Sequence, residues 1–291
     1  VSFEVLQSIS RFGYANEDYV VEGIVKNTGT SNAESVLVRA QIFWSTGTKR
    51  GEGIRQTDLK ILRPGETSPF KVTVYYCCPE LIDYYTLDVV GVETTKEPYR
   101  DVVVLNDYLS SFYHFGWIPS WKVYAEALNL GDRTIRSAGL SVYTVFYDCN
   151  GQMLSRDYGY VLGFSGQGHL APGWKVPFSQ STSLFDPVGS YEFWMQATLL
   201  EEGIYPAYLS AIVTGTRTDQ YGDLYTVARI TNHSDVAVSQ HYMYVVYRDE
   251  QGRVTACIGG EHESPDEPLA PGETREFQYP VYYSWLIPED Y

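Results

Sequence analysis

The chain has 291 residues, of which 44% are hydrophobic, and its 36 acidic and 21 basic residues give a formal net charge of −15. This length predicts two or three domains, and the hydrophobic content excludes a disordered chain because it suffices for packed cores. The negative charge excludes nucleic acid and anionic membrane surfaces as favoured partners, since phosphate binding requires a basic surface.

The chain opens with VSFEVLQSIS, which alternates apolar and polar residues and so predicts a strand instead of a signal-peptide core. We expect any secretion signal to be absent or already removed. No apolar run approaches the roughly 18 residues of a membrane-spanning helix. With 26 Tyr, only 3 Met and long mixtures of Val, Tyr and Thr, the composition predicts an almost entirely β protein.

Three similar units follow, with a period of about 100 residues, which is the size of one β-sandwich domain. Each begins with a strand-like run that ends near an Asn: YVVEGIVKNTG (19–29), VYAEALNLGD (123–132) and YTVARITNHSD (225–235). A second strand-like run then closes on a Gly turn, at Gly47, Gly151 and Gly252. The last shared element is LRPGETSPF (62–70), LAPGWKVPF (170–178) or LAPGETREF (269–277).

The shared Pro-Gly pair predicts a tight turn, because Pro presets φ at one position and Gly tolerates a positive φ at the next. We expect the flanking Leu and Phe to enter the core, so the repeated frame is scaffold. The sequence therefore predicts an all-β fold of three tandem immunoglobulin-like β-sandwich domains, residues 1–98, 99–203 and 204–291. Asp148 and Asp249 should lie in equivalent hairpin turns and cap backbone amides.

These motifs resemble the FxLyD family of bacterial extracellular β-sandwich domains. The matching residues are Val142, Phe146, Tyr147, Asp148 and Gly151 in the second unit, and Val245, Tyr247, Asp249 and Gly252 in the third. In the first unit Ser45 is assigned to the place of the Asp. The resemblance implies an immunoglobulin-like fold and an envelope or secreted location. It implies no catalytic activity, because the family has no shared active site.

No residue pattern predicts a catalytic, cofactor or metal site. The five His residues, at positions 114, 169, 233, 241 and 262, lack paired-ligand spacing and are expected at surface or cross-strand positions. GFSGQG (163–168) is interpreted as a loop because no helix pattern follows it. GGEHESPDEP (259–268) is interpreted as a solvated acidic loop, ahead of a Ca²⁺ site.

The four cysteines do not repeat between units, which argues against the intersheet disulfide of antibody domains. We expect Cys77, Cys78, Cys149 and Cys257 to be mainly free, partly buried thiols. The N-x-S/T sequon at Asn232 falls at the polar turn of the repeat, so turn chemistry explains it better than a glycan.

Aromatic residues crowd in DYLSSFYHFGWIPSW (107–121). Two interpretations are open: packing at the junction between the first two domains, or an exposed platform for a sugar or a protein partner. The candidate partner-binding aromatics are Trp117, Trp121 and Trp174, the last of which replaces the Glu of the sister turns.

The sequence thus predicts a non-enzymatic extracellular or cell-surface protein that serves as a binding, adhesion or spacer module. One alternative is a structural subunit of an extracellular filament assembled by strand exchange, with the N-terminal strand as donor. A further alternative is an accessory region of a larger secreted enzyme. The expected partners are accordingly a protein, a carbohydrate or a second copy of the chain.

Overall fold

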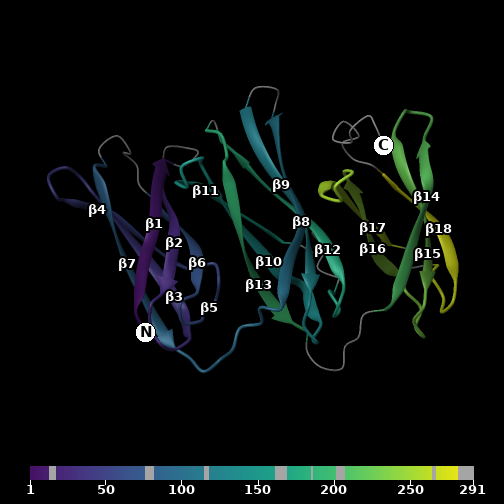
Figure 1. The fold of residues 1–291 in the computed structure, drawn as a ribbon, viewed down its shortest axis with the longest axis horizontal. Coiled ribbons are helices and arrows are strands. Elements are labelled where there is room, and N and C mark those ends of the chain that lie inside the picture. Colours follow the sequence, from purple (N-terminus) through teal and green to yellow (C-terminus); the bar gives the residue numbers. More distant parts are fainter. Residues whose placement is uncertain are drawn as a thin grey trace.

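The computed structural model describes residues 1–12, 18–75, 82–114, 118–160, 169–184, 186–200, 207–263 and 267–280 (Figure 1). Across these residues the chain forms strands and no helix, which confirms the all-β prediction. The strands fall into three groups, called units 1, 2 and 3 below. Within the described ranges, no sheet combines strands from two units.

Each unit is built from antiparallel strands. Unit 1 contains β1 (Phe3–Phe12), β2 (Asp18–Asn27), β3 (Ala33–Phe43), β4 (Lys49–Gln56), β5 (Ile61–Leu62), β6 (Thr67–Tyr75) and β7 (Tyr84–Glu93). Unit 2 contains β8 (Val102–His114), β9 (Ile118–Asn129), β10 (Ile135–Tyr147), β11 (Met153–Tyr160), β12 (Lys175–Ser183) and β13 (Ser190–Leu199). Unit 3 contains β14 (Leu209–Thr218), β15 (Leu224–Asn232), β16 (Gln240–Arg248), β17 (Val254–Glu263) and β18 (Thr274–Pro280).

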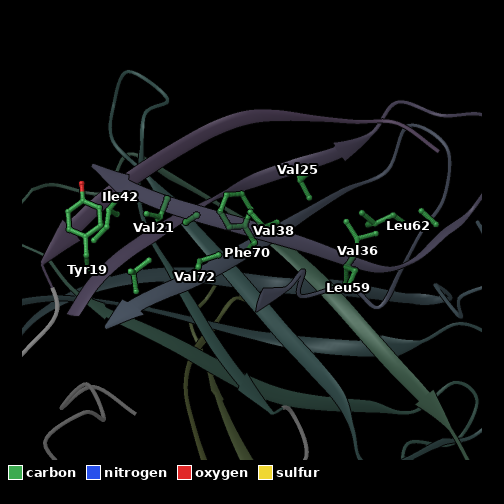
Figure 2. Close-up of a cluster of buried hydrophobic side chains, with 13 residues drawn as sticks. Tyr19, Val21, Val25, Val36, Val38, Ile42, Leu59, Leu62, Phe70 and Val72 are labelled. Atoms are coloured by element: carbon green, nitrogen blue, oxygen red, sulfur yellow. The ribbon is translucent and has the colours of Figure 1, made fainter. Parts of the chain in front are cut away.

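The same strand order recurs in the three units. One sheet has the order β1-β2-β6 in unit 1, β8-β9-β12 in unit 2 and β14-β15-β18 in unit 3. The opposing sheet is β4-β3-β7 with β5 on β3, then β11-β10-β13, then β16-β17. The two sheets of a unit enclose its core: in unit 1, Val21 and Phe70 of one sheet pack with Val38 of the other (Figure 2). The sheets are therefore paired as in a sandwich.

The units are stacked face to face along the longest axis of the molecule (Figure 1). Strands β1 and β2 contact β11 of the next unit, and β8, β9 and β12 contact β17 of the one after. As a result β2 is buried on both faces. Val21 packs in the core of unit 1, whereas Ile24 packs with Val145 and Met153 of unit 2.

A buried Asn organises the corner of each unit. Asn27 is fully buried, and its side-chain amide donates hydrogen bonds to the carbonyl oxygens of Ser31 (2.9 Å) and Leu62 (3.0 Å). Its side-chain oxygen accepts from the amide of Gly29 at 3.0 Å. Asn129 and Asn232 are equally buried and make the equivalent bonds in units 2 and 3. The Asn therefore ties the turn after β2 to the Pro-Gly element some 35 residues later.

The Pro-Gly turn is the second half of this corner. Gly65 has a φ of 78° and donates its amide hydrogen to the backbone oxygen of Asn27 at 2.8 Å. Gly173 and Gly272 repeat both features. The flanking Leu and Phe side chains are buried in all three units, as expected: Leu62, Leu170, Leu269, Phe70, Phe178 and Phe277. The repeated frame is thus confirmed as scaffold.

The predicted hairpin turns at Asp148 and Asp249 are also confirmed. Oδ1 of Asp148 accepts hydrogen bonds from the amides of Asn150 and Gln152, both at 2.8 Å. Asp249 makes the equivalent bonds in unit 3. In unit 1 the assignment of Ser45 to this position is wrong by one residue. Trp44 occupies it, because its backbone bonds to Thr48 and Gly47 match those of Asp148 to Gln152 and Gly151.

Several loop and surface expectations need correction. His241 and His262 are register partners on β16 and β17, yet the His241 side chain lies in the core, with Nε2 2.8 Å from the hydroxyl of Tyr279. The first half of the predicted acidic loop, as far as Glu263, belongs to β17 because the hairpin continues that far. GFSGQG lies outside the described residues.

The cysteine and sequon predictions are partly confirmed. Cys149 and Cys257 are free, and Cys257 is partly buried as expected, but Cys149 is exposed because it lies in a hairpin turn. Cys77 and Cys78 lie outside the described residues. At the sequon, Asn232 donates both amide hydrogens within the corner, which confirms the turn-chemistry interpretation.

Candidate functional site

The structure separates the candidate aromatics. Trp117 lies outside the described residues. Trp121 is on β9, where it packs against the buried Val123 and Phe146 of its own unit. Trp174 lies near the opposite end of the same sheet, just before Lys175. In the pairing of β12 with β9, Trp121 lies opposite Thr182, whereas Lys175 lies opposite Leu128. At the usual rise per strand residue, the two Trp residues are roughly 20 Å apart. Trp121 and Trp174 do not share a surface.

The described parts of the crowded aromatic segment, 107–114 and 118–121, lie on the paired strands β8 and β9. Trp121 packs within unit 2, and so does Leu109 of the neighbouring strand. Tyr108 faces unit 3 instead, with the guanidinium of Arg253 at 4.9 Å from its ring centroid. Among the described side chains of the segment, the Tyr108 ring therefore lies at the second junction.

Truncation of Trp121 tests this placement. A half-buried Trp in a core cluster should contribute less than the 3–5 kcal/mol lost when a fully buried Trp is truncated, and we expect Trp121→Ala to cost about 2 kcal/mol. Chemical denaturation measures the change. Tyr221→Ala, which removes an 81% exposed ring, is the control and should have little effect. An unchanged midpoint for Trp121→Ala would contradict the core assignment.

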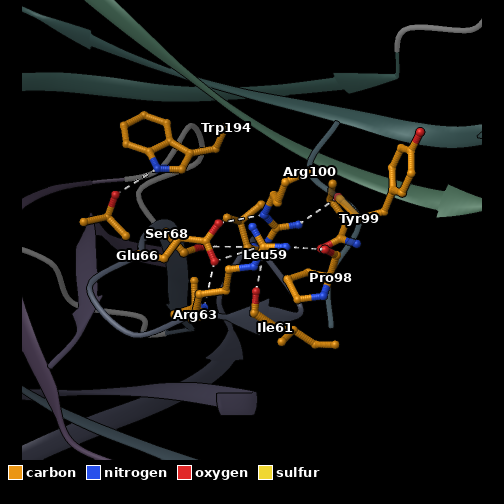
Figure 3. Close-up of polar contacts among 12 residues, drawn as sticks. Leu59, Ile61, Arg63, Glu66, Ser68, Pro98, Tyr99, Arg100 and Trp194 are labelled. Atoms are coloured by element: carbon orange, nitrogen blue, oxygen red, sulfur yellow. Dashed lines mark hydrogen bonds and ion pairs between the residues drawn. The ribbon is translucent and has the colours of Figure 1, made fainter. Parts of the chain in front are cut away.

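The linker between units 1 and 2 is held by the Pro-Gly corner of unit 1 (Figure 3). Nε of Arg100 donates to Glu66 at 2.6 Å, and its Nη2 donates to the carbonyl oxygen of Ile61 at 2.8 Å. Arg63 donates to the carbonyl oxygen of Pro98 at 3.0 Å. Glu66 is the residue directly after the turn glycine, so the corner that closes the unit also binds the linker.

The same linker also reaches the buried Asn of unit 2. The hydroxyl of Tyr99 donates to the side-chain oxygen of Asn129 at 2.7 Å. Nearby, the indole N–H of Trp194 on β13 donates to the hydroxyl of Thr67 in unit 1 at 3.1 Å (Figure 3). The linker is thus attached to both units by side-chain hydrogen bonds.

A cavity of about 190 Å³ lies at this first junction, between the linker, Leu59 and the strand that carries Trp194. Its charged groups, Glu66 and Arg100, bind each other and the surrounding backbone. No group of three or more His, Cys, Asp or Glu that could hold a metal ion occurs in the described part of the chain. The arrangement supports attachment of the two units and offers no nucleophile paired with a base.

A buried ion pair crosses the first junction away from the linker. Arg156 on β11 binds both carboxylate oxygens of Asp58, which follows β4, with Nε 2.8 Å from Oδ2. The side chains are 12% and 8% exposed. Burial raises the pKa of the Asp58 carboxyl to about 6, against the opposing effect of the Arg156 charge. Arg156 also lies beside the rings of Tyr143 and Tyr158. Among the described residues, the pair is the most buried ion pair between the two units.

The second junction uses the same corner position with different chemistry. Trp174 replaces the Glu of the corner, and its ring lies 6.0 Å from that of Tyr208 in the next linker. Across the sheets, Glu126 on β9 forms an ion pair with Arg248 on β16 at 2.6 Å. The Glu-to-Trp change was visible in the sequence, but its linker partner was not, because the linkers carry no repeated motif.

No helix among the described residues is long and apolar enough to cross a membrane. The chain matches no protein-family model and no curated protein sequence.

Proposed function

We propose that the chain is a non-enzymatic extracellular or cell-surface protein that acts as a rigid spacer and presents surfaces for binding or adhesion. In this proposal units 1 to 3 are tandem immunoglobulin-like domains related to the FxLyD family, with boundaries at residues 1–98, 99–203 and 204–291. The observation that carries it is the pair of junctions, in which each linker is bound by the corner of the preceding unit.

The contacts between units support rigidity. Domains of one chain move relative to each other by default unless their interface is extensive and apolar. Here Ile24 and Val145 are buried between units 1 and 2, and the Asp58–Arg156 ion pair crosses the same junction. Separation of the units would return the apolar side chains to water and lose the free energy of their burial. The closed arrangement is therefore favoured over free rotation.

The filament alternative by strand exchange is less well supported. β1 is the strand that would be donated, and it pairs with β2 of its own chain from Phe3 to Phe12. Exchange would require these backbone hydrogen bonds to break in every copy. The accessory-region alternative is compatible with a rigid spacer, since such a region would hold a neighbouring domain at a fixed distance. A protein or carbohydrate partner for Trp117, Trp121 or Trp174 stays a prediction.

A distance measurement across the whole stack tests the spacer. Spin labels at Thr46 in unit 1 and Gln220 in unit 3 occupy exposed turn positions, in a background with the native cysteines replaced by Ser. We expect one narrow distance distribution. Arg100→Ala removes the contacts to Glu66 and Ile61 and should broaden it. The exposed Arg55→Ala is the matched control and should not. A broad distribution in the unmodified protein would contradict the proposal.

A further inference from the structure

The last strand of units 1 and 2 has no counterpart among the described residues of unit 3. β3 lies between β4 and β7 in unit 1, and β10 lies between β11 and β13 in unit 2, with all pairs antiparallel. β16 is the equivalent strand of unit 3, but within the described residues it pairs only with β17 (Figure 1). One edge of β16 is therefore left without a described neighbour. We call it the β16 edge.

The core of unit 3 is less well covered beside this edge. Val245 on β16 precedes its hairpin turn by the same four residues as Ala40 on β3 and Thr144 on β10. Ala40 and Thr144 are fully buried, and they pair with Leu87 of β7 and Phe193 of β13. Val245 is only partly buried, although it packs against the core of unit 3. The side chain that the last strand places opposite this position is what covers it in the other two units.

Val213 on β14 shows the same opening from the other sheet. It pairs with the fully buried Ala228, and residues directly opposite on paired strands share one face of the sheet, so Val213 faces the core. Val213 is nevertheless 55% exposed. The equivalent pair in unit 1 is Ser8 with Gly23, and there the Ser8 hydroxyl lies 2.9 Å from the hydroxyl of Tyr85 on β7. In unit 1 the last strand thus reaches the position that is exposed in unit 3.

The strands that occupy this place in units 1 and 2 define the chemistry of an occupant. β7 packs every second residue from Tyr85 to Val89 against the core of unit 1. β13 does the same in unit 2 from Phe193 to Leu199. Each of these strands is ten residues long, and polar residues occupy most of the alternate positions. The occupant that fits is an extended segment with an apolar side chain at every second residue.

Residues 281–291 are too few to supply this strand. The connection to the last strand takes eight residues in unit 1, 76–83, and six in unit 2, 184–189. Of the 11 residues that follow Pro280, such a connection would leave 11 − 8 = 3 or 11 − 6 = 5, against the ten residues of β7 or β13. The occupant is therefore a different segment.

We propose that the β16 edge binds an extended strand of a partner polypeptide, which adds antiparallel to β16 and inserts its alternate apolar side chains between Val245 and Val213. An exposed strand edge is a template for such pairing. Backbone hydrogen bonds to the edge supply the affinity, and the alternating side chains supply the specificity. The inference needs only the fold of unit 3, so it is independent of the spacer role.

A peptide with the sequence of β13, SYEFWMQATL, is the probe that tests the proposal. Calorimetric titration of the full chain should show one site, and hydrogen exchange of the β16 amides should slow when the peptide is bound. Val213→Glu places a charge against the apolar side of the added strand and should raise the dissociation constant about tenfold or more. Ile212→Glu is the matched control. Ile212 is 69% exposed on the opposite face of the same strand, so the dissociation constant should not change.

A second peptide tests the alternation. It has the same composition, but its four polar residues are grouped at one end, and it should not bind. Thermal denaturation confirms that both variants fold. Absence of binding at millimolar peptide overturns the proposal, and so does binding that Val213→Glu leaves unchanged or that the regrouped peptide matches. Self-association of the wild-type chain that Val213→Glu abolishes would identify a second copy as the source of the strand and overturn the assignment to a separate partner.

Discussion

Replacing Asn27 by Ala should lower the free energy of unfolding of unit 1 by about 3 kcal/mol or more. The substitution removes both hydrogen bonds to the carbonyl oxygens of Ser31 and Leu62 and leaves the amide of Gly29 without its acceptor. A buried polar group without a partner costs about 1–3 kcal/mol, and the bond to Leu62 is buried. Hydrogen exchange of the β2 and β6 amides measures the effect on this unit specifically.

Two further variants separate the hydrogen bonds from the volume of the side chain. Asn27→Asp keeps the shape but replaces the donating amide with an acceptor that faces two carbonyl oxygens, so it should destabilise at least as much as Ala at neutral pH. Asn150→Ala removes an exposed Asn from a hairpin turn and should change stability by less than about 0.5 kcal/mol. If Asn27→Asp kept the wild-type protection of the β2 and β6 amides from hydrogen exchange, the donor role of the Asn27 side-chain amide would be refuted.

The corners could be predicted from the sequence because each depends on a local pattern that occurs three times. The turn glycine, the Leu and Phe beside it, and the Asn upstream recur at matching positions, and each has one physical role. The error at Ser45 came from aligning the first hairpin by its side chains. Counting back from Gly47, whose φ is positive as in Gly151, places Trp44 at the Asp position.

The stacking of units leaves a signal in the sequence of β2. The run VVEGIV in β2 is apolar at consecutive positions except Glu22 and Gly23, which is typical of a strand covered on both faces. In β15 the corresponding run, YTVARI, is buried only at every second residue from Thr226 to Ile230, as expected for a strand with one less covered face. β2 and β15 thus differ as strands of an internal and a terminal sheet. His241 was misjudged because its core partner Tyr279 is 38 residues away.

The junction residues were beyond prediction from one sequence. Asp58 and Arg156 are 98 residues apart, and neither belongs to the repeated motifs. Their pairing depends on how unit 2 is rotated on unit 1, which periodicity does not encode. Trp121 and Trp174 were grouped because both are Trp, yet they lie near opposite ends of one sheet. The residue type alone marked both as candidates for packing. Only the fold shows that Trp121 packs in the core of unit 2 and that Trp174 lies at the second junction.

Arg156→Ala should have the largest effect at the first junction, lowering the free energy of unfolding by about 3–5 kcal/mol near neutral pH. Removing one partner of a buried ion pair leaves the other charge desolvated and uncompensated, which accounts for a loss of this size. Here the remaining charge is Asp58, whose side chain is 8% exposed. Denaturation of the full chain, followed by the fluorescence of Trp194 at the junction, measures the change.

The cost of Arg156→Ala should depend on pH in a defined direction. Burial already raises the pKa of Asp58 to about 6, and loss of the arginine charge raises that pKa further. A carboxyl with a raised folded-state pKa stabilises the fold when protonated, and this contribution is lost as pH rises through that pKa. The difference in the free energy of unfolding between Arg156→Ala and the wild type should therefore be smaller below pH 6 and larger above it. In an Asp58→Asn background, Arg156→Ala should lose most of this pH dependence. A cost that is equal on both sides of pH 6 would show that Arg156 acts through its contacts with Tyr143 and Tyr158 and not through its charge.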